Sequence, residues 1–175
     1  FTLSRREPAY VGRARAPAEM EAGRLAGRTP ERLRVLLDRA GAGAEETQFG
    51  SCVFANRPGD GSAREQAASC QKVLGGFANI CYGFATKRYR SNCINWGILP
   101  FTLEEGTAFP YEPGDCVFIP GIREAVRTGR EDIPARVLRA DGGEEEILLH
   151  IRGLTAEERE IILDGCLMNY YAGRG

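Results

Sequence analysis

Residues 59–65 are the part of the sequence best suited to chemistry. Their sequence is Gly-Asp-Gly-Ser-Ala-Arg-Glu, and they lie between an apolar stretch, 51–55, and a segment with helical character. Glycine lets backbone N–H groups approach a ligand closely, and the first turn of a helix adds free N–H donors and a partial positive charge. Ser62 at this point, with Arg64 two residues further on, predicts a binding site for a carboxylate or phosphate group.

The same loop also allows a structural hypothesis, in which Ser62 only caps the helix that follows. Known motifs of other classes fit less well. A P-loop requires a lysine that is missing after Gly61, and a dinucleotide-binding loop requires a third glycine where Arg64 stands. A hydrolase elbow requires a glycine two residues on each side of its serine. A Ser–His–Asp triad would depend on His150, the single histidine, which we expect to be structural.

Strands alternating with helices are predicted to position this loop. We expect a buried strand at 51–55, a helix over 62–74, a strand near 78–82, a helix over 86–96 and a third apolar stretch at 98–101. The apolar face of the first helix is predicted to carry Ala67, Cys70, Val73 and Leu74. Such alternation is typical of a parallel sheet covered by helices.

The residues before this unit predict a lead-in and one helix. Residues 1–28 are rich in Arg, Ala and Gly, and we expect a strand-like start at 1–3 followed by a solvated, partly helical segment of the same domain. The next helix is predicted to have Thr29 as N-cap, Pro30 in its first turn and Gly41 at its end. Its apolar face is predicted to carry Leu33, Leu36, Leu37 and Ala40.

The last third of the chain has a different character. A short strand is predicted at 115–120. Two further strands, 135–139 and 146–150, flank the Asp-Gly-Gly sequence of 141–143, which is typical of a hairpin. A final helix is predicted to start at Thr155, because a glutamate three residues on completes a capping box.

These elements together predict an α/β fold over residues 1–175, with a mostly parallel central sheet flanked by helices, a C-terminal β-hairpin and a final helix. No repeat or linker divides the chain, so we expect one domain. With 23 Lys and Arg against 24 Asp and Glu, the net charge is −1, which gives no global attraction to nucleic acid or anionic membranes. The basic run 87–90 is interpreted as a solvated helix face rather than a nucleic-acid site.

Other sequence features predict a cytoplasmic protein. The apolar runs are too short to span a bilayer, and no signal peptide pattern opens the chain. No pair of cysteines has C-x-x-C spacing, so we predict buried, reduced thiols and no metal site in this chain. Ile94 and Trp96 are expected in the core. The cysteines are Cys52, Cys70, Cys81, Cys93, Cys116 and Cys166.

Several motifs, in order and at matching spacing, resemble the aconitase and isopropylmalate isomerase family. Residues 59–68, Gly-Asp-Gly-Ser-Ala-Arg-Glu-Gln-Ala-Ala, followed by Leu-Gly-Gly at 74–76, are similar to the family's G-[ED]-G-S-S-R-E-H-A and L-G-G sequences. The further segments that resemble the family are 82–85, Asn92, 97–100 and 146–149. The chain resembles most a bacterial aconitase-like hydratase branch, and the resemblance covers about residues 51–169 and, more weakly, the start of the chain.

The resemblance implies a swivelling β/β/α domain that supplies part of a hydro-lyase active site. Such enzymes catalyse the reversible hydration and dehydration of a small polycarboxylate. The serine aligned with Ser62 is the base, and the arginine aligned with Arg64 binds a substrate carboxylate. Backbone donors around Gly61, Ser62 and Ala63 would complete the anion pocket. A serine can act as a base only where N–H donors and cations stabilise its alkoxide, which is what this loop offers.

The resemblance further implies that the active site is completed by another part of the protein. Because the chain opens at Phe1, we expect a C-terminal fragment of a longer chain whose isolated form is inactive. The partner would be the cluster-bearing N-terminal domains of the same protein. A 4Fe-4S cluster there would act as Lewis acid on the substrate hydroxyl, and no cofactor is expected in this fragment. A second substrate-binding arginine matches Arg6 best, with Arg5 as the alternative.

Two positions depart from the family pattern. Ala63 stands where the family has a second serine, and Gln66 stands where it has a histidine. The first change removes a hydroxyl that would contact the substrate. Two hypotheses therefore remain: an active hydratase domain, and a catalytically silent domain that keeps the fold and binds a small anion or a partner.

Overall fold

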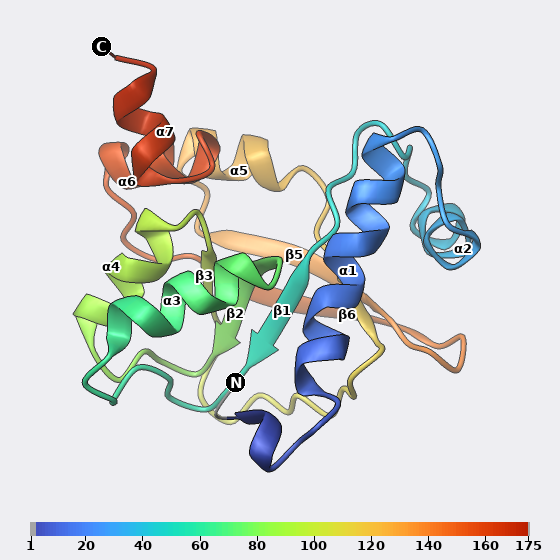
Figure 1. The fold of residues 1–175 in the computed structure, drawn as a ribbon, viewed down its shortest axis with the longest axis horizontal. Helices are drawn as coiled ribbons and strands as arrows, with labels where there is room; N and C mark the ends of the chain where they lie inside the picture. Colours follow the sequence, from blue (N-terminus) through green and yellow to red (C-terminus); the bar gives the residue numbers. More distant parts are fainter. Residues whose placement is uncertain (1–2, 175) are drawn as a thin grey trace.

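Alternating strands and helices build the half of the molecule that carries the 59–65 loop. The computed structural model describes residues 3–174 (Figure 1). The elements of this half are β1 (Ser51–Phe54), α3 (Arg64–Val73), β2 (Gly76–Cys81), α4 (Lys87–Asn95) and β3 (Leu99–Thr102). Strands β1, β2 and β3 pair in parallel, because each helix carries the chain back to the same end of the sheet. The loops that follow these strands therefore lie at one end of the sheet.

Antiparallel pairing builds the other half. Its elements are β4 (Cys116–Phe118), α5 (Ile122–Thr128), β5 (Asp132–Leu138), β6 (Glu144–His150), α6 (Ala156–Leu163) and α7 (Leu167–Ala172). The sheet order is β1-β2-β3-β6-β5-β4, and the two halves meet where Thr102 of β3 pairs with His150 of β6. The predicted hairpin is confirmed as β5 and β6. The predicted capping box of the final helix is also confirmed, with Thr155 as N-cap of α6.

The predicted α/β class, a sheet flanked by helices, is confirmed by these elements. Three further segments precede them: a 3-10 helix, η1 (Leu3–Arg5), and the helices α1 (Tyr10–Leu25) and α2 (Glu31–Ala40). Helix α1 runs alongside β1 in Figure 1 and buries none of its own residues completely. The strand predicted at 1–3 is wrong at Leu3, which opens η1, while residues 1 and 2 lie outside the described part of the chain.

Two packed clusters hold the site half in place. The larger one joins both halves of the sheet, with Ile80, Phe101 and Leu149 almost completely buried against α5. The smaller one lies between α3, α4 and the start of β3. It consists of Ala68, Tyr89, Cys93 and Ile98. The loop between β1 and α3 is therefore attached to a helix pair that has its own core.

The buried face of α3 differs from the prediction. The helix buries Ala68 and Gln71, whereas Cys70 is exposed and Val73 is 80% exposed. Small apolar residues occur all around this helix, so its periodicity did not identify one face. Gln71 can be buried because its Nε2 donates to Asn79 Oδ1 at 2.7 Å and to the Ala78 carbonyl at 3.2 Å.

Two other local predictions need correction. Helix α2 has Pro30, not Thr29, as its N-cap, because Pro30 itself has an extended ψ of 145°. Its end at Gly41 is confirmed, and Leu33 and Leu37 are buried as predicted. Strand β1 is not a buried strand, because it lies at the edge of the sheet, where Phe54 is 38% exposed.

The cysteines are free thiols, as predicted, but only two of them are buried. Cys81 and Cys93 are buried, whereas Cys52 and Cys70 are exposed. Cys52 is exposed because β1 is an edge strand. The expected core position of Ile94 is confirmed, while Trp96 is only partly buried.

Candidate functional site

The predicted anion-binding loop connects β1 to α3, and it presents Ser62 to solvent. Helix α3 begins at Arg64, and its N-cap is Ala63, which has no side chain able to cap. The hypothesis that Ser62 is merely the helix cap is therefore wrong. The Ser62 side chain is exposed, and no other residue of the 3–174 range holds its hydroxyl by a hydrogen bond. A serine hydroxyl left unpaired beside a helix start is available to a ligand.

Hydrogen bonds to two neighbouring carbonyls fix the loop. The Gly59 carbonyl accepts from Arg64 Nε at 3.1 Å and from Thr86 Oγ1 at 3.0 Å. The Pro58 carbonyl accepts from the Ala85 N–H at 2.9 Å. Thr86 is also the N-cap of α4, where its hydroxyl accepts from Tyr89 N–H at 3.2 Å. The loop therefore ties the start of α3 to the start of α4.

Gly59 is required at its position for two independent reasons. Its φ of +96° lies in the region that favours glycine. A Cβ built on Gly59 would lie 2.4 Å from the Tyr89 side chain, which is too close for any residue with a side chain. The glycine-rich sequence that predicted close approach to a ligand also allows close approach to the protein's own helix.

Positive charge is concentrated around this loop. The Arg64 side chain uses only Nε for the Gly59 carbonyl, so the two terminal nitrogens of its guanidinium have no partner among the described residues. Arg57, Lys87 and Arg88 are exposed, and none forms an ion pair within the described part of the chain. Asp60 is the nearest acidic residue in the loop. Unpaired cations beside two helix starts favour an anionic ligand.

Glu65, the acidic residue that follows Arg64, points to α4 instead of to the loop. Its Oε1 accepts from Trp96 Nε1 at 2.5 Å. This bond joins the first turn of α3 to the C-cap residue of α4, and it directs the Glu65 carboxylate away from the anion site. Trp96 therefore has a polar contact as well as its partly buried position against Ala68 and its neighbours.

Arg6 is the one predicted site residue that the structure does not bring to the loop. It is exposed, directly after η1, and no hydrogen bond or ion pair within the described chain joins it to residues 56–63. In Figure 1 the N-terminal turn and the arrowheads of β1 and β2 lie toward the same end of the molecule. Its role as a second carboxylate binder stays a prediction, as does the alternative, Arg5.

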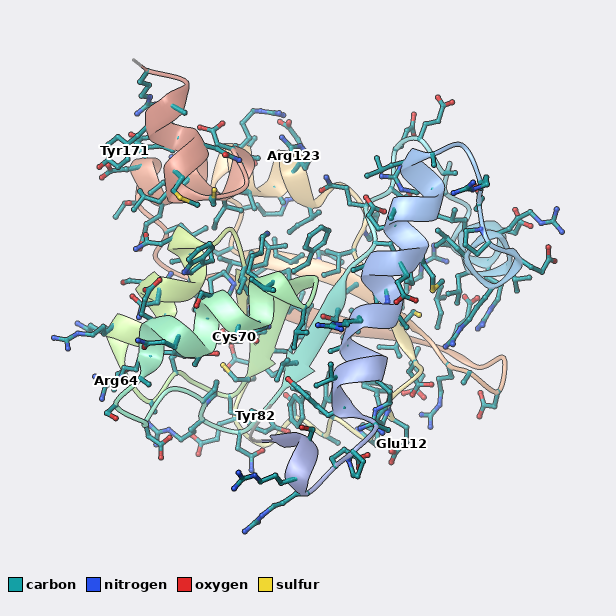
Figure 2. All side chains as sticks on the ribbon, viewed as in Figure 1. Arg64, Cys70, Tyr82, Glu112, Arg123 and Tyr171 are labelled. Atoms are coloured by element: carbon teal, nitrogen blue, oxygen red, sulfur yellow. The ribbon has the colours of Figure 1, made fainter. Side chains whose placement is uncertain are left out.

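A separate groove lies between α1, β1 and residues 109–117. It has a cavity volume of about 820 Å³, and its walls include Tyr10 of α1 and Phe54 of β1. Phe54 stacks on Phe109 with ring centroids 4.2 Å apart. Figure 2 shows that Glu112, on the groove wall, lies far from Arg64 at the N-terminal end of α3. Neither Ser62 nor Arg64 lines this groove.

No metal-binding cluster forms within residues 3–174, where no three His, Cys, Asp or Glu side chains converge on one point. The cysteines lie on different elements, from β1 to the start of α7. The described residues therefore offer no ligand set that fits an iron–sulfur cluster. None of the helices formed by these residues has the length and apolar character needed to cross a membrane.

Comparison with known proteins indicates the same family as the motif around Ser62. Residues 44–106, which contain β1, the loop, α3, β2, α4 and β3, match the family model for the aconitase C-terminal domain. This part of the chain belongs to the aconitase C-terminal domain family. The resemblance found in the sequence is thereby confirmed.

The relatives are named as hydratases and dehydratases. Aconitate hydratase A of Bradyrhizobium diazoefficiens is 30% identical over 130 residues, which cover 72% of this chain and 14% of the relative. The 3-isopropylmalate dehydratase small subunit of Metallosphaera sedula is 37% identical over 112 residues, which cover 64% of this chain and 58% of the relative. This chain thus matches only part of each relative's length.

A solved structure gives a further similarity. The 3-isopropylmalate dehydratase (LeuD) of Methanocaldococcus jannaschii has a TM-score of 0.46 and 26% sequence identity. The similarity covers 75% of this chain and 68% of that chain.

The tertiary structure adds residues to the site that sequence reasoning missed. Thr86 was expected only as the start of a helix, and Tyr89 only as part of a basic run. Both contact Gly59 across the loop. A threonine before a helical segment is a recognisable capping signal, but its second bond, to Gly59, depends on the packing of α4 against the loop. Arg57 likewise gave no signal beyond its charge.

Proposed function

We propose that this chain is the swivelling domain of an aconitase-like hydratase, and that the complete protein interconverts a hydroxylated and an unsaturated polycarboxylate. In this proposal Ser62 is the base, and Arg64 and Arg6 bind substrate carboxylates. The backbone N–H groups of Gly61, Ser62 and Ala63 form the anion pocket. The names of the relatives support this class of reaction, although each relative extends beyond the matched region.

The observation that carries the proposal is the exposed, unpartnered hydroxyl of Ser62 on a fixed loop. A structural serine at a helix start would bond to the backbone, as Thr86 and Thr155 do at α4 and α6. Ser62 does not, although it lies in the segment that matches the family. The loop holds the hydroxyl while leaving it free to bond with a substrate.

The chemistry assigned to this chain is proton transfer at carbon. Ser62 Oγ, as an alkoxide, takes the proton from the carbon next to a carboxylate. The electron pair of the broken C–H bond forms the double bond, and the hydroxyl on the neighbouring carbon leaves. The Arg64 guanidinium and the start of α3 stabilise negative charge on the serine oxygen and on the substrate carboxylate. Hydration is the reverse sequence.

The leaving hydroxyl needs groups that this chain does not supply near Ser62. In the proposal these groups, and a 4Fe-4S cluster if the protein has one, belong to a larger partner body, either in the same chain or in a second subunit. The name "small subunit" of the Metallosphaera relative supports division of the site between two bodies. This chain contributes the base and the carboxylate-binding arginines.

The test is a substrate screen on the complete protein, purified without oxygen. Citrate, isocitrate, isopropylmalate and their unsaturated partners are followed by the ultraviolet absorbance of the double bond. We expect turnover with at least one polycarboxylate, and none from the 175-residue chain alone. Carboxylate binding without turnover by the complete protein would favour the catalytically silent domain, which the missing hydroxyl at Ala63 also suggests. Turnover by the isolated chain would contradict the divided site.

A further inference from the structure

We propose that Tyr89 of α4 is the positioning residue for the Ser62 loop. This inference rests on the proposed function, and it adds a residue that the family motif around Ser62 does not include. The proposed role is to support Gly59 and so hold the Ser62 hydroxyl in a fixed place, without touching the substrate.

The loop packs directly on the body of the domain where Gly59 meets Tyr89. A Cβ on Gly59 would lie 2.4 Å from Cβ, Cγ and Cδ1 of Tyr89, so the glycine backbone rests directly on the tyrosine side chain. Tyr89 is 7% exposed, and its ring also packs near Phe84, with centroids 6.2 Å apart. The position of the ring therefore determines how closely the loop approaches α4.

A buried polar network fixes the tyrosine in turn. Asn79 Nδ2 donates to the Tyr89 hydroxyl at 3.4 Å and to Cys93 Sγ at 3.3 Å. Asn79 Oδ1 accepts from Gln71 Nε2 at 2.7 Å. Asn79 is 2% exposed and Cys93 is fully buried, so this network is shielded from solvent. Burial raises the pKa of the Tyr89 hydroxyl above its ordinary value.

The network joins three elements of the parallel half through buried side chains. Gln71 lies on α3, Asn79 on β2, and Tyr89 and Cys93 on α4. Since α3 begins directly after the loop and α4 supports it at Gly59, the network fixes both sides of the loop. Buried polar groups with fixed partners specify one geometry more strongly than apolar contacts do.

Positioning matters here because the proposed base transfers a proton from carbon. Such a step is sensitive to small displacements of the catalytic group, and a misplacement of about 1 Å can lower a rate by about 10²-fold. Removing the ring beneath Gly59 would leave the loop's hydrogen bonds to Thr86 and Ala85, but it would remove the surface that sets their geometry.

The first test measures kcat and KM of Tyr89→Leu, Tyr89→Met and Tyr89→Phe in the complete protein. We expect kcat to fall by about 10-fold to 10²-fold in the leucine and methionine variants, with KM changed less than about threefold. Tyr89→Phe keeps the ring and should retain kcat within about threefold. The matched control is Ile94→Ala, which removes a fully buried side chain from the same helix but packs against α6 and α7.

The second test needs no activity, and it separates this inference from the proposed function. The Ala85 amide, bonded to the Pro58 carbonyl at 2.9 Å, reports whether the loop is docked. In the leucine and methionine variants we expect its hydrogen exchange to accelerate about tenfold more than in Ile94→Ala. The positioning role would be overturned if Ile94→Ala lowered kcat equally or if Ala85 exchange were unchanged. If the wild-type protein had no turnover, the exchange result alone would decide.

Discussion

The β5–β6 hairpin of the antiparallel half and the Ser62 loop of the parallel half use their charged residues in opposite ways. In the antiparallel half, Arg139 pairs with Glu145 at 2.9 Å, and Arg136 lies 3.7 Å from Glu144 across the hairpin. In the parallel half, Arg57 and the terminal nitrogens of Arg64 have no partner among the described residues. Cations of the hairpin already have carboxylate partners in the chain, whereas cations left unpaired beside an exposed serine are available to a ligand.

The topology explains this division. An antiparallel hairpin can close over a few residues, so opposite strands bring their side chains together in register. A parallel pair needs a long connection through a helix, and that connection begins with a loop at the end of the strand. The loop after β1 is such a connection. The proposed chemistry therefore lies where the chain leaves the sheet. This division of roles between the two halves can be tested by mutations in either of them.

The largest effect is expected at Ser62. In the complete protein, Ser62→Ala should lower kcat by about 10³-fold, because a base in proton transfer typically contributes about 10²-fold to 10⁴-fold. The free energy of unfolding should stay unchanged, since the hydroxyl has no partner in the described structure. Steady-state kinetics and denaturant unfolding measure the two quantities. Ser69→Ala, on α3, is the matched control, and a near-normal rate for Ser62→Ala would remove Ser62 from the mechanism.

The second effect tests the antiparallel half. Leu149 of β6 is fully buried, so Leu149→Ala should lower the free energy of unfolding by about 2–5 kcal/mol. Its neighbour Leu148 is 49% exposed, and Leu148→Ala should cost about 0.5 kcal/mol or less. The kcat of the folded fraction should be unchanged in both variants. A specific loss of kcat in Leu149→Ala would show that the halves are not divided in function.

The third effect concerns the affinity for substrate. Arg64→Gln should raise KM by about 10-fold to 10²-fold, because a hydrogen bond to a charged group is worth about 1.5–3 kcal/mol. The comparison variant is Arg127→Gln in α5, whose guanidinium already pairs with the exposed Glu124 and should leave KM unchanged. Isothermal titration with a carboxylate ligand checks the same change without turnover. Equal binding by both variants would contradict a ligand role for Arg64.

The smallest effect is a pH dependence in the antiparallel half. Backbone N–H groups of Glu112 and Ala140 bond to the Asp115 carboxylate at 2.9 and 2.8 Å and hold its pKa below the ordinary value of 3.8. Because the folded pKa is depressed, Asp115 stabilises the fold above its unfolded pKa. That contribution is lost as pH falls through the folded pKa. Thermal unfolding between pH 6 and pH 3 should therefore show a smaller loss of stability for Asp115→Asn, and identical profiles would contradict this role.

The sequence predicted local structure well wherever the signal was local. Thr155 and the following glutamate predicted a capping box, and the Asp-Gly-Gly sequence predicted the hairpin that joins β5 and β6. It predicted less well where a segment has no single apolar face. Helix α3 buries Gln71 and exposes Val73, because hydrogen bonds to Asn79 and Ala78 compensate for a polar side chain in the interior. Periodicity cannot detect such a partner.

The sequence by itself determined the family, the strand–loop–helix unit and the presence of one serine and one arginine at a glycine-rich bend. Those properties depend on residues that are neighbours in the chain. Only the tertiary structure decided that Ser62 is not a helix cap, that Arg6 has no bond to the loop, and that Gly59 rests on Tyr89. These outcomes depend on contacts between residues distant in sequence, and their geometry is set when α3 and α4 pack together on the sheet.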